Sequence, residues 1–205
     1  MHLYVYGDSH IRNFTGNSDG MYGDVYVEAK TQKIEMSVMK LSSTGPTMYG
    51  LPNPDSKTGA GKRADRWIHE SGAEDVLFVL GEVDCREFLC RNESPDQFIG
   101  DTIVRFEQYR TTLPPLRSLG LFGVCPPSRR LVTERGCYTL PYVVAKFNDV
   151  LHGYCSASGF KFISVYRDVV DDCGFLNMHY GEKDGIHLSP TLVRPFVADA
   201  LDRAY

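Results

Sequence analysis

The sequence predicts an α/β protein, in which helices cover both faces of a mostly parallel sheet in three layers. Two observations lead to this prediction. Short apolar runs alternate with longer amphipathic segments along the 205 residues, which is the pattern of strand, crossover helix and parallel strand. The composition, 42% hydrophobic and 23% charged, is that of an ordinary globular protein long enough to bury a full core. We therefore expect residues 1–205 to form a single domain.

Five segments are expected to form the sheet. Each is rich in β-branched or aromatic residues and is bounded by residues that favour turns, as buried parallel strands are. In chain order they are Leu3–Tyr6, Met36–Leu41, Val76–Leu80, Leu119–Cys125 and Phe160–Val165. Between the first two lies Gly16–Lys33, where Gly, Asn, Asp and Tyr crowd the first half and Asp24–Glu28 alternates like a short strand. That segment fits a loop or a hairpin.

Four segments have the apolar periodicity of helices. In Lys62–Glu70 three apolar residues share one face, and Pro95–Leu113 carries a longer apolar stripe that ends before a Pro-Pro pair. A third helix is expected over Pro141–Ser156, which begins with Pro and closes before a Gly, and a fourth over Pro190–Arg203. Helices therefore separate most of the expected strands.

The net charge and the hydropathy of the chain argue against some classes of binding partner. The net charge is −4, so the chain has no basic field of the kind that attracts nucleic acid. The longest apolar run among the strand-like segments, Val76–Leu80, is far shorter than the roughly 20 residues that cross a bilayer. Met1–Tyr6 reads as a first strand rather than a secretion signal, and the six cysteines include no C-x-x-C pair. We expect a cytoplasmic protein with mostly reduced thiols, and neither a nucleic-acid nor a membrane partner.

Residues able to do chemistry follow the expected strands. Ser9 stands after the first strand in Gly7–His10, where open α/β sheets place their ligands. Near the C-terminus, Asp184–His187 puts an acid and an imidazole three residues apart, a spacing that lets Asp184 reach Nδ1 and leaves Nε2 free. We expect a nucleophile, a base and an orienting acid to meet at one sheet edge.

Gly7–His10 and Asp184–His187, in this order, resemble the motifs of the SGNH hydrolases, also called the GDSL-like family, and the resemblance spans nearly the whole chain. It implies a flavodoxin-like sheet and a reaction that requires no metal or organic cofactor. It also implies that Ser9 is the nucleophile, that His187 is the general base and that Asp184 orients His187. The family's second block falls at Gly45, so the resemblance places the oxyanion hole at the backbone N–H groups of Ser9 and Gly45.

The third block of the family departs from the pattern. The family has Gly-x-Asn-Asp there, whereas this chain has Gly81-Glu82-Val83-Asp84, so the amide that would complete the oxyanion hole is missing at Val83. Arg86 follows closely and carries a multi-donor fork, which could replace that amide or hold a substrate carboxylate. In the alternative interpretation Glu82, Asp84 and Arg86 form an ion-pair network that fixes the loop.

Two residues beside the nucleophile complete the candidate pocket. Asp8 precedes Ser9 and His10 follows it. His10 is interpreted either as a packed wall of the pocket or as a second acid or base. The pocket is expected to take a small-molecule or carbohydrate ester.

The resemblance implies ester hydrolysis or acyl transfer through an acyl-enzyme on Ser9, with a small acyl group such as acetyl on a sugar as the expected substrate. The loss of the amide at Val83 favours an alternative, a catalytically weak or inactive binding or accessory module of the same fold. A third possibility is a two-metal phosphoesterase. Such enzymes also need a Gly-Asn-His segment and paired late histidines, but the only Asn between Asp101 and Phe175 is Asn148.

Overall fold

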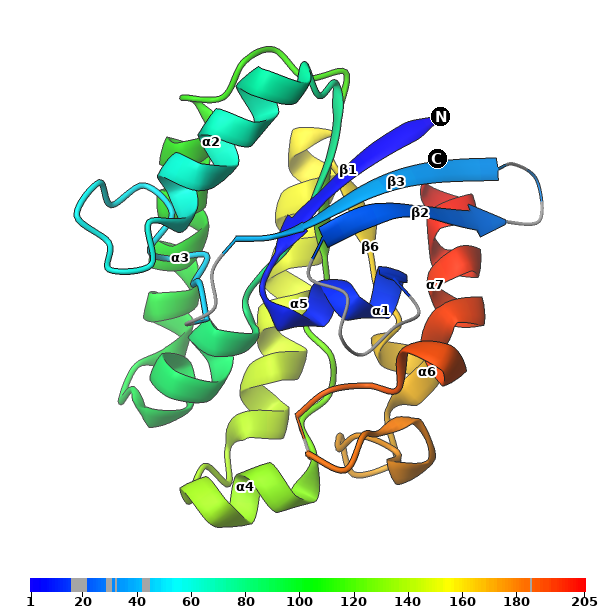
Figure 1. Cartoon of the computed structure of the whole chain (residues 1–205). Helices are drawn as coiled ribbons and strands as arrows, with labels where there is room; N and C mark the ends of the chain where they lie inside the picture. The colour runs from blue at the N-terminus through cyan, green and yellow to red at the C-terminus, as the bar shows by residue number, and fades with distance from the viewer. Residues whose placement is uncertain (16–21, 29–30, 32, 42–44, 185) are drawn as a thin grey trace.

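The computed structural model describes residues 1–15, 22–28, 31, 33–41, 45–184 and 186–205. One six-stranded sheet organises them, with the strand order β2-β3-β1-β4-β5-β6 (Figure 1). The strands are β1 (His2–Gly7), β2 (Tyr22–Glu28), β3 (Lys33–Lys40), β4 (Asp75–Val79), β5 (Ser118–Phe122) and β6 (Lys161–Ile163). Residues 16–21, 29–30 and 32 of the segment expected as a loop or hairpin, and residue 185 of the Asp184–His187 motif, lie outside the described residues.

The parallel part of the sheet confirms the expected fold. Strands β3, β1, β4, β5 and β6 pair in parallel, and they are the five expected strands in the order second, first, third, fourth, fifth, which is flavodoxin-like. The sheet has one strand more than expected, because β2 pairs antiparallel with β3 at the edge. The alternation in Asp24–Glu28 therefore belongs to a strand, and the hairpin interpretation of that stretch was the better one.

Helices lie on both faces of the sheet and give the predicted three layers (Figure 1). On one face are α2 (Ala60–Ser71), α3 (Pro95–Arg110) and α5 (Leu140–Ser158), which share an apolar core cluster with the sheet. On the other face α1 (Arg12–Thr15) and α7 (Pro190–Ala204) contribute to a second cluster. Further short elements are α4 (Arg129–Arg135), α6 (Tyr166–Val169), the 3₁₀ turns η1 (Ser9–Ile11), η3 (Leu89–Arg91) and η4 (Met178–Tyr180), and the π-helical turn η2 (Asp84–Phe88).

Local chemistry explains where these elements begin and end. All five residues of β4 are buried, as expected for a central strand covered on both faces. Three long helices have Pro in their first turn, where the missing N–H has no partner to lose. Helix α5 ends at Gly159, whose φ of 72° is in the left-handed region that glycine favours.

The end of β1 requires a glycine. A Cβ built on Gly7 would lie 2.3 Å from the carbonyl oxygen of Val79 at the end of β4. Any side chain there would push the two central strands apart, so Gly7 lets the chain turn out of the sheet directly after β1. That turn carries Ser9.

Two further findings concern membrane-spanning helices and the pairing of cysteines. None of the helices in the described residues is long and apolar enough to span a bilayer. All six cysteines, which lie in the described part of the chain, are unpaired. The reduced state of the thiols stays a prediction.

Candidate active site

The nucleophile turn consists of residues 8–12, between β1 and α1. The backbone N–H of Asp8 donates to the carbonyl of Val79 at 3.0 Å, which fixes the turn to the end of β4. The Asp8 carboxylate caps η1 by accepting the N–H of His10 at 2.8 Å. Ser9 is the first residue of η1, and the first N–H groups of a helical turn have no partner within it. Its position therefore leaves Ser9 with a free backbone donor beside its hydroxyl.

The structure brings the three predicted catalytic residues into one hydrogen-bonded chain. His187 Nε2 lies 2.7 Å from Ser9 Oγ, and His187 Nδ1 lies 2.6 Å from Asp184 Oδ2. The other oxygen of Asp184 accepts the backbone N–H groups of Ile186 and His187 at 2.9 and 3.0 Å. Ser9 and His187 are 178 residues apart in the sequence, and they meet because the 181–188 loop returns to the carboxyl end of β1.

The pKa shifts of Asp184 and His187 favour a neutral His187 in this hydrogen-bonded chain. Burial acts to raise the pKa of Asp184, but hydrogen bonds from the backbone N–H and imidazole of His187 outweigh it and lower that pKa to about 2. Burial lowers the pKa of His187, and the charge on His10 lowers it further. An ionised Asp184 holds a proton on Nδ1 of His187, so Nε2 is left as the acceptor that faces Ser9.

The oxyanion side of the site joins the second and third sequence blocks. Gly45 has a φ of 68°, and a Cβ built on it would lie 3.1 Å from Cγ2 of Val83. Residue 83 therefore stands directly against Gly45, where the resemblance places a donor for the oxyanion. An isopropyl group occupies that place, and it offers no hydrogen bond.

Asp84 fixes this arrangement from behind. It is fully buried, and its two oxygens accept the N–H groups of Met48 and Tyr49 at 2.8 and 3.0 Å. Burial raises the pKa of Asp84 to about 6, against those two hydrogen bonds. Asp84 thus ties the loop that carries Gly45 to the turn after β4, and it lies outside the ion-pair network considered from the sequence.

Arg86 is engaged by carboxylates. Its guanidinium donates to both oxygens of Glu82, one of them at 3.3 Å from Nη2, and Nη1 donates to Glu87. Arg135 also donates to Glu87, which extends the network to the surface. Arg86 and Glu82 therefore follow the network interpretation, and the part of the guanidinium that a substrate carboxylate would need is already paired.

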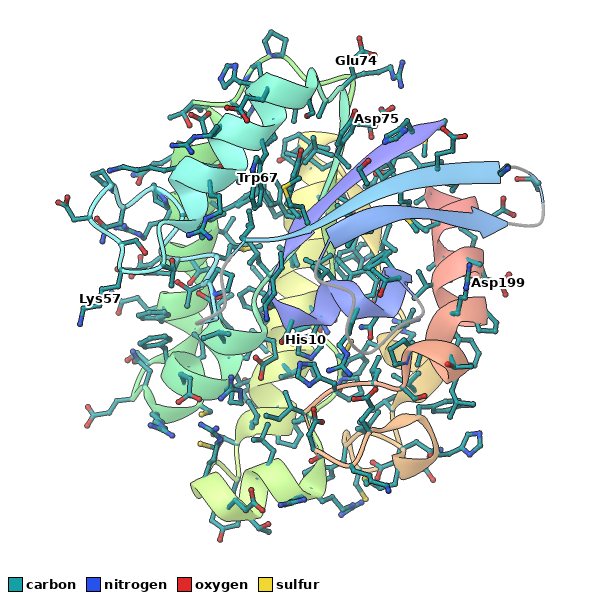
Figure 2. All side chains as sticks on the ribbon, in the orientation of Figure 1. His10, Lys57, Trp67, Glu74, Asp75 and Asp199 are labelled. Atoms are coloured by element: carbon teal, nitrogen blue, oxygen red, sulfur yellow. The ribbon has the colours of Figure 1, made fainter. Side chains whose placement is uncertain are left out.

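His10 belongs to the nucleophile turn (Figure 2), and its ring reaches the loop that carries the base. Only 4% of it is exposed. Its Nδ1 is 3.2 Å from Asp8 Oδ1, and its Nε2 is 3.4 Å from the carbonyl oxygen of Ile186. Burial acts to lower the pKa of His10, but the charge and hydrogen bond of Asp8 raise it to about 9.

Two small cavities lie near the triad, and neither is lined by a triad residue. One of about 10 Å³ is lined by His10, Glu82, Arg86, Pro127 and Ile186 among others, and a neighbouring one of the same size reaches Asp8. Such a space is about one water probe in size. Two much larger cavities, of about 560 and 630 Å³, lie at the β6 edge and near the start of β5, and neither is lined by a triad residue.

The metal cage of a two-metal phosphoesterase does not form among the residues that the structure describes. They contain no group of three or more His, Cys, Asp or Glu side chains placed to hold a metal ion. Of the late histidines, His179 packs edge-to-face against Tyr180 with the ring centroids 4.9 Å apart, whereas His187 contacts Ser9.

One contact of the site has no signal in the sequence. Arg12 Nη2 donates to Glu182 Oε2 at 2.6 Å, and both side chains are largely buried. The pair links the nucleophile turn to the start of the 181–188 loop, and 170 residues separate its members. Neither residue stands in a motif, so only the fold reveals that they meet.

Comparison with known proteins supports this geometry at the level of the fold. By sequence, the chain matches no family model and no curated protein. Among solved structures it is similar to a GDSL-like lipase from Bacteroides thetaiotaomicron, with 16% identity, a TM-score of 0.60 and coverage of 99% of this chain and 86% of that one. It is also similar to a proposed SGNH hydrolase from Slackia heliotrinireducens, with 14% identity, a TM-score of 0.58 and coverage of 100% and 98%.

A third similar structure is a catalytic mutant of an acetylxylan esterase from Geobacillus stearothermophilus. It has 12% identity, a TM-score of 0.56 and coverage of 99% of this chain and 93% of that one. All three comparisons span nearly the whole of this chain at low identity. The chain therefore has the fold of the SGNH, or GDSL-like, hydrolases, as its motifs indicated.

Proposed function

We propose that this chain is a serine ester hydrolase or acyl transferase. The observation that carries the proposal is the unbroken chain from Ser9 Oγ through His187 to Asp184, with contacts of 2.7 and 2.6 Å. A binding pocket has no use for a hydroxyl, an imidazole and a carboxylate in this order, whereas nucleophilic catalysis requires it.

The reaction follows from the protonation states. Ser9 Oγ attacks the acyl carbonyl while its proton passes to His187 Nε2, and the resulting imidazolium is stabilised by Asp184. His187 then gives the proton to the leaving alcohol as the C–O bond breaks, which leaves an ester on Ser9. Water or another alcohol, deprotonated by His187, attacks that ester and regenerates Ser9.

Negative charge that develops on the carbonyl oxygen needs donors. The backbone N–H groups of Ser9 and Gly45 are the two that we assign to this oxyanion hole. Val83 adds none, although it stands against Gly45. A two-donor hole supports catalysis but stabilises the oxyanion less than a three-donor one, since one donor is typically worth about 10²- to 10³-fold in kcat.

We further propose a small acyl group, acetyl above all, carried by a carbohydrate. A similar structure is an acetylxylan esterase, which supports a sugar acetate as the first substrate to try.

A fluorophosphonate probe tests the catalytic assignment, because only an activated serine forms the adduct. We expect the intact mass of the protein to increase by one probe, with the adduct on the peptide that contains Ser9. The Ser9→Ala variant should stay unlabelled, and Ser164→Ala, which removes a serine outside the site, should label like the wild type. An unlabelled wild-type protein would contradict the proposal.

The substrate is tested by chain length. We expect kcat/KM on aryl acetate to exceed that on aryl butyrate and to exceed that on aryl octanoate by at least about tenfold, because a site fitted to acetyl must rearrange to admit a longer chain. Release of acetate from acetylated xylo-oligosaccharides, followed by NMR, tests the sugar. A preference for octanoate would overturn the small-acyl proposal and leave the esterase proposal standing.

Val83 favours one other candidate, an accessory module of this fold that binds an ester or glycan without turning it over. That module predicts no fluorophosphonate adduct and saturable binding of acetylated oligosaccharide by calorimetry. The esterase predicts the adduct, and acetate release in the same mixture.

A further inference from the structure

A second histidine, His10, lies beside the triad and is not one of its three residues. His10 is buried to 4% exposure, and its partner Asp8 to 2%. The carboxylate Oδ1 of Asp8 accepts the backbone N–H of His10 at 2.8 Å and faces its ring Nδ1 at 3.2 Å. This carboxylate is thus held by the nucleophile turn itself.

The other ring nitrogen of His10 faces a second acceptor. Nε2 is 3.4 Å from the carbonyl oxygen of Ile186, the residue before the base. A carboxylate and a carbonyl only accept hydrogen bonds. An imidazole that donates to both carries a proton on each nitrogen and is therefore a cation.

The contact with Ile186 joins the two halves of the triad. It links the turn that carries Ser9 to the loop that carries His187, and Arg12 makes the parallel link to Glu182 at 2.6 Å. The 181–188 loop is closed on itself by an antiparallel bridge between Gly181 and Leu188. The bridge and the contacts at Glu182 and Ile186 together hold His187 beside the nucleophile turn.

His10 also lies close to the base. The ring centroids of His10 and His187 are 5.0 Å apart. At this distance, between two largely buried rings, a cation disfavours a second cation. A charged His10 therefore favours the neutral form of His187, which is the form that accepts the serine proton.

We propose that His10 is a positioning residue, a buried imidazolium that is charged at neutral pH, anchors the loop of the base against the nucleophile turn and keeps His187 neutral. The proposal goes beyond the triad and rests on the proposed esterase function for its catalytic consequence. It gives the Asp8–His10 pair a role that neither the packed-wall interpretation nor the second-base interpretation contains.

The charges around the two rings agree with this role. His10 faces Asp8 and, further off, Glu82, whose charge is itself balanced by Arg86. Burial acts to lower the pKa of His10, but these carboxylates raise it to about 9.

His187 faces His10 and Arg12, which lower its pKa in addition to burial, and Asp184, which raises it. Removal of the His10 charge leaves burial, Arg12 and Asp184 in place, so the protonation midpoint of His187 must move to higher pH.

The experiment separates the charge from the hydrogen bond. In His10→Gln the side-chain amide keeps a donor in reach of the Ile186 carbonyl but carries no charge. His152→Gln is the matched control, because His152 is exposed and packs on Phe162 at the far cavity. Histidine ¹H–¹³C NMR titration follows His10 and His187 directly, and the pH profile of kcat/KM on an aryl acetate follows the base through catalysis.

We expect three results. In the wild type, His10 stays protonated from pH 5 to 8. In His10→Gln, His187 titrates at higher pH than in the wild type, and the ratio of kcat/KM at pH 5.5 to that at pH 8.5 falls by at least about threefold. His152→Gln matches the wild type in both measurements.

Other results overturn the proposal. A wild-type His10 that titrates near its ordinary pKa contradicts the cation, and this measurement needs no variant, so it decides even where His10→Gln fails to fold. An unchanged midpoint of His187 in a folded His10→Gln contradicts the effect of the charge. The NMR readout does not require turnover: an inactive enzyme with a shifted His187 refutes the proposed function and leaves the role of His10 standing.

Discussion

Two neighbouring turns of this molecule treat a buried carboxylate in different ways. The nucleophile turn, residues 8–12, follows β1, and the turn of residues 81–88 follows β4, its parallel neighbour in the sheet. Asp8 in the first and Asp84 in the second are both buried. Asp8 faces the imidazole of His10, whereas Asp84 accepts two backbone N–H groups.

The difference shows what each turn contributes. In the first turn the charges of His10 and Arg12 connect to the 181–188 loop and so to the base. In the second turn Asp84 holds the loop that carries Gly45, and the Arg86 guanidinium is paired with Glu82 and Glu87. In the proposed site the acid–base half is complete and reinforced, whereas the half that we assign to the oxyanion is held by Asp84 and has one donor fewer than the family pattern.

The largest expected effect comes from the first turn and its partner loop. Ser9→Ala and His187→Ala should each lower kcat on an aryl acetate by at least about 10⁴-fold, and the double variant should be little worse than either, because the residues act as one unit. The kcat/KM of the wild type should rise with pH as His187 loses its proton, with a midpoint below the ordinary histidine value, since burial and His10 lower that pKa. Additive losses in the double variant would refute the triad.

The buried cation of the first turn should also be visible in stability. Asp8 raises the pKa of His10 from 6.5 to about 9, against the effect of burial. A raised pKa stabilises the folded state fully below pH 6.5, and that contribution is lost as the pH rises through about 9. We expect the free energy of unfolding, measured with urea, to fall by on the order of 3 kcal/mol across that range relative to His10→Gln. Parallel curves for the two proteins would contradict a charged His10.

The second turn should respond through its backbone contacts. In Asp84→Asn one of the two acceptor oxygens becomes an NH₂ group, so the N–H of Met48 or Tyr49 loses its partner. Such a loss costs about 1 to 3 kcal/mol, which for a chain of this size lowers Tm by roughly 2 to 10 °C. Thermal unfolding at pH 8 measures it, where Asp84 is ionised. Asp55→Asn, at an exposed site, is the control, and an unchanged Tm in Asp84→Asn would show that Asp84 does not hold the loop.

The sequence predicted some parts of the fold and of the candidate site better than others. The five parallel strands, the main helices and the α/β class followed from apolar periodicity, because these patterns are local and repeat along each element, whereas the flavodoxin-like order came from the resemblance to the SGNH hydrolases. The Ser9–His187–Asp184 chain was predicted from two motifs whose types and order suit one reaction. The π-helical turn η2 and the Arg12–Glu182 link were missed, and β2 was expected only as one of two alternatives, because these features depend on residues far apart in the sequence or on short, irregular backbone.

The roles of the charged residues were harder to predict than the secondary structure. From the sequence, Asp84 and Arg86 were interpreted as members of one ion-pair network. The structure distinguishes them by their burial and by their hydrogen-bond partners. Asp84 is at 0% exposure with backbone partners, whereas Arg86 pairs with carboxylates. His10 had two interpretations, and its two ring contacts, both with acceptors, favour a third.

The smallest expected effect, and the sharpest test of the incomplete half, is Val83→Asn. Residue 83 stands against Gly45, so an amide there can reach the oxyanion that Gly45 binds. The new hydrogen bond strengthens as charge develops, and it should therefore raise kcat on an acetyl ester by about tenfold while KM changes less. The controls are Val83→Leu, which adds bulk without a donor, and Arg86→Ala.

Arg86→Ala decides between two sources of the third donor. Because the Arg86 guanidinium is engaged by Glu82 and Glu87, we expect its removal to change kcat by less than about threefold, far below the 10²- to 10³-fold that an oxyanion donor typically provides. If Arg86→Ala instead costs about 2 to 4 kcal/mol of transition-state stabilisation and Val83→Asn gives nothing, Arg86 supplies the donor and the hole is complete without an amide. If neither variant changes turnover while Ser9→Ala abolishes it, residue 83 does not face the oxyanion, and the contrast between the two turns fails at that position.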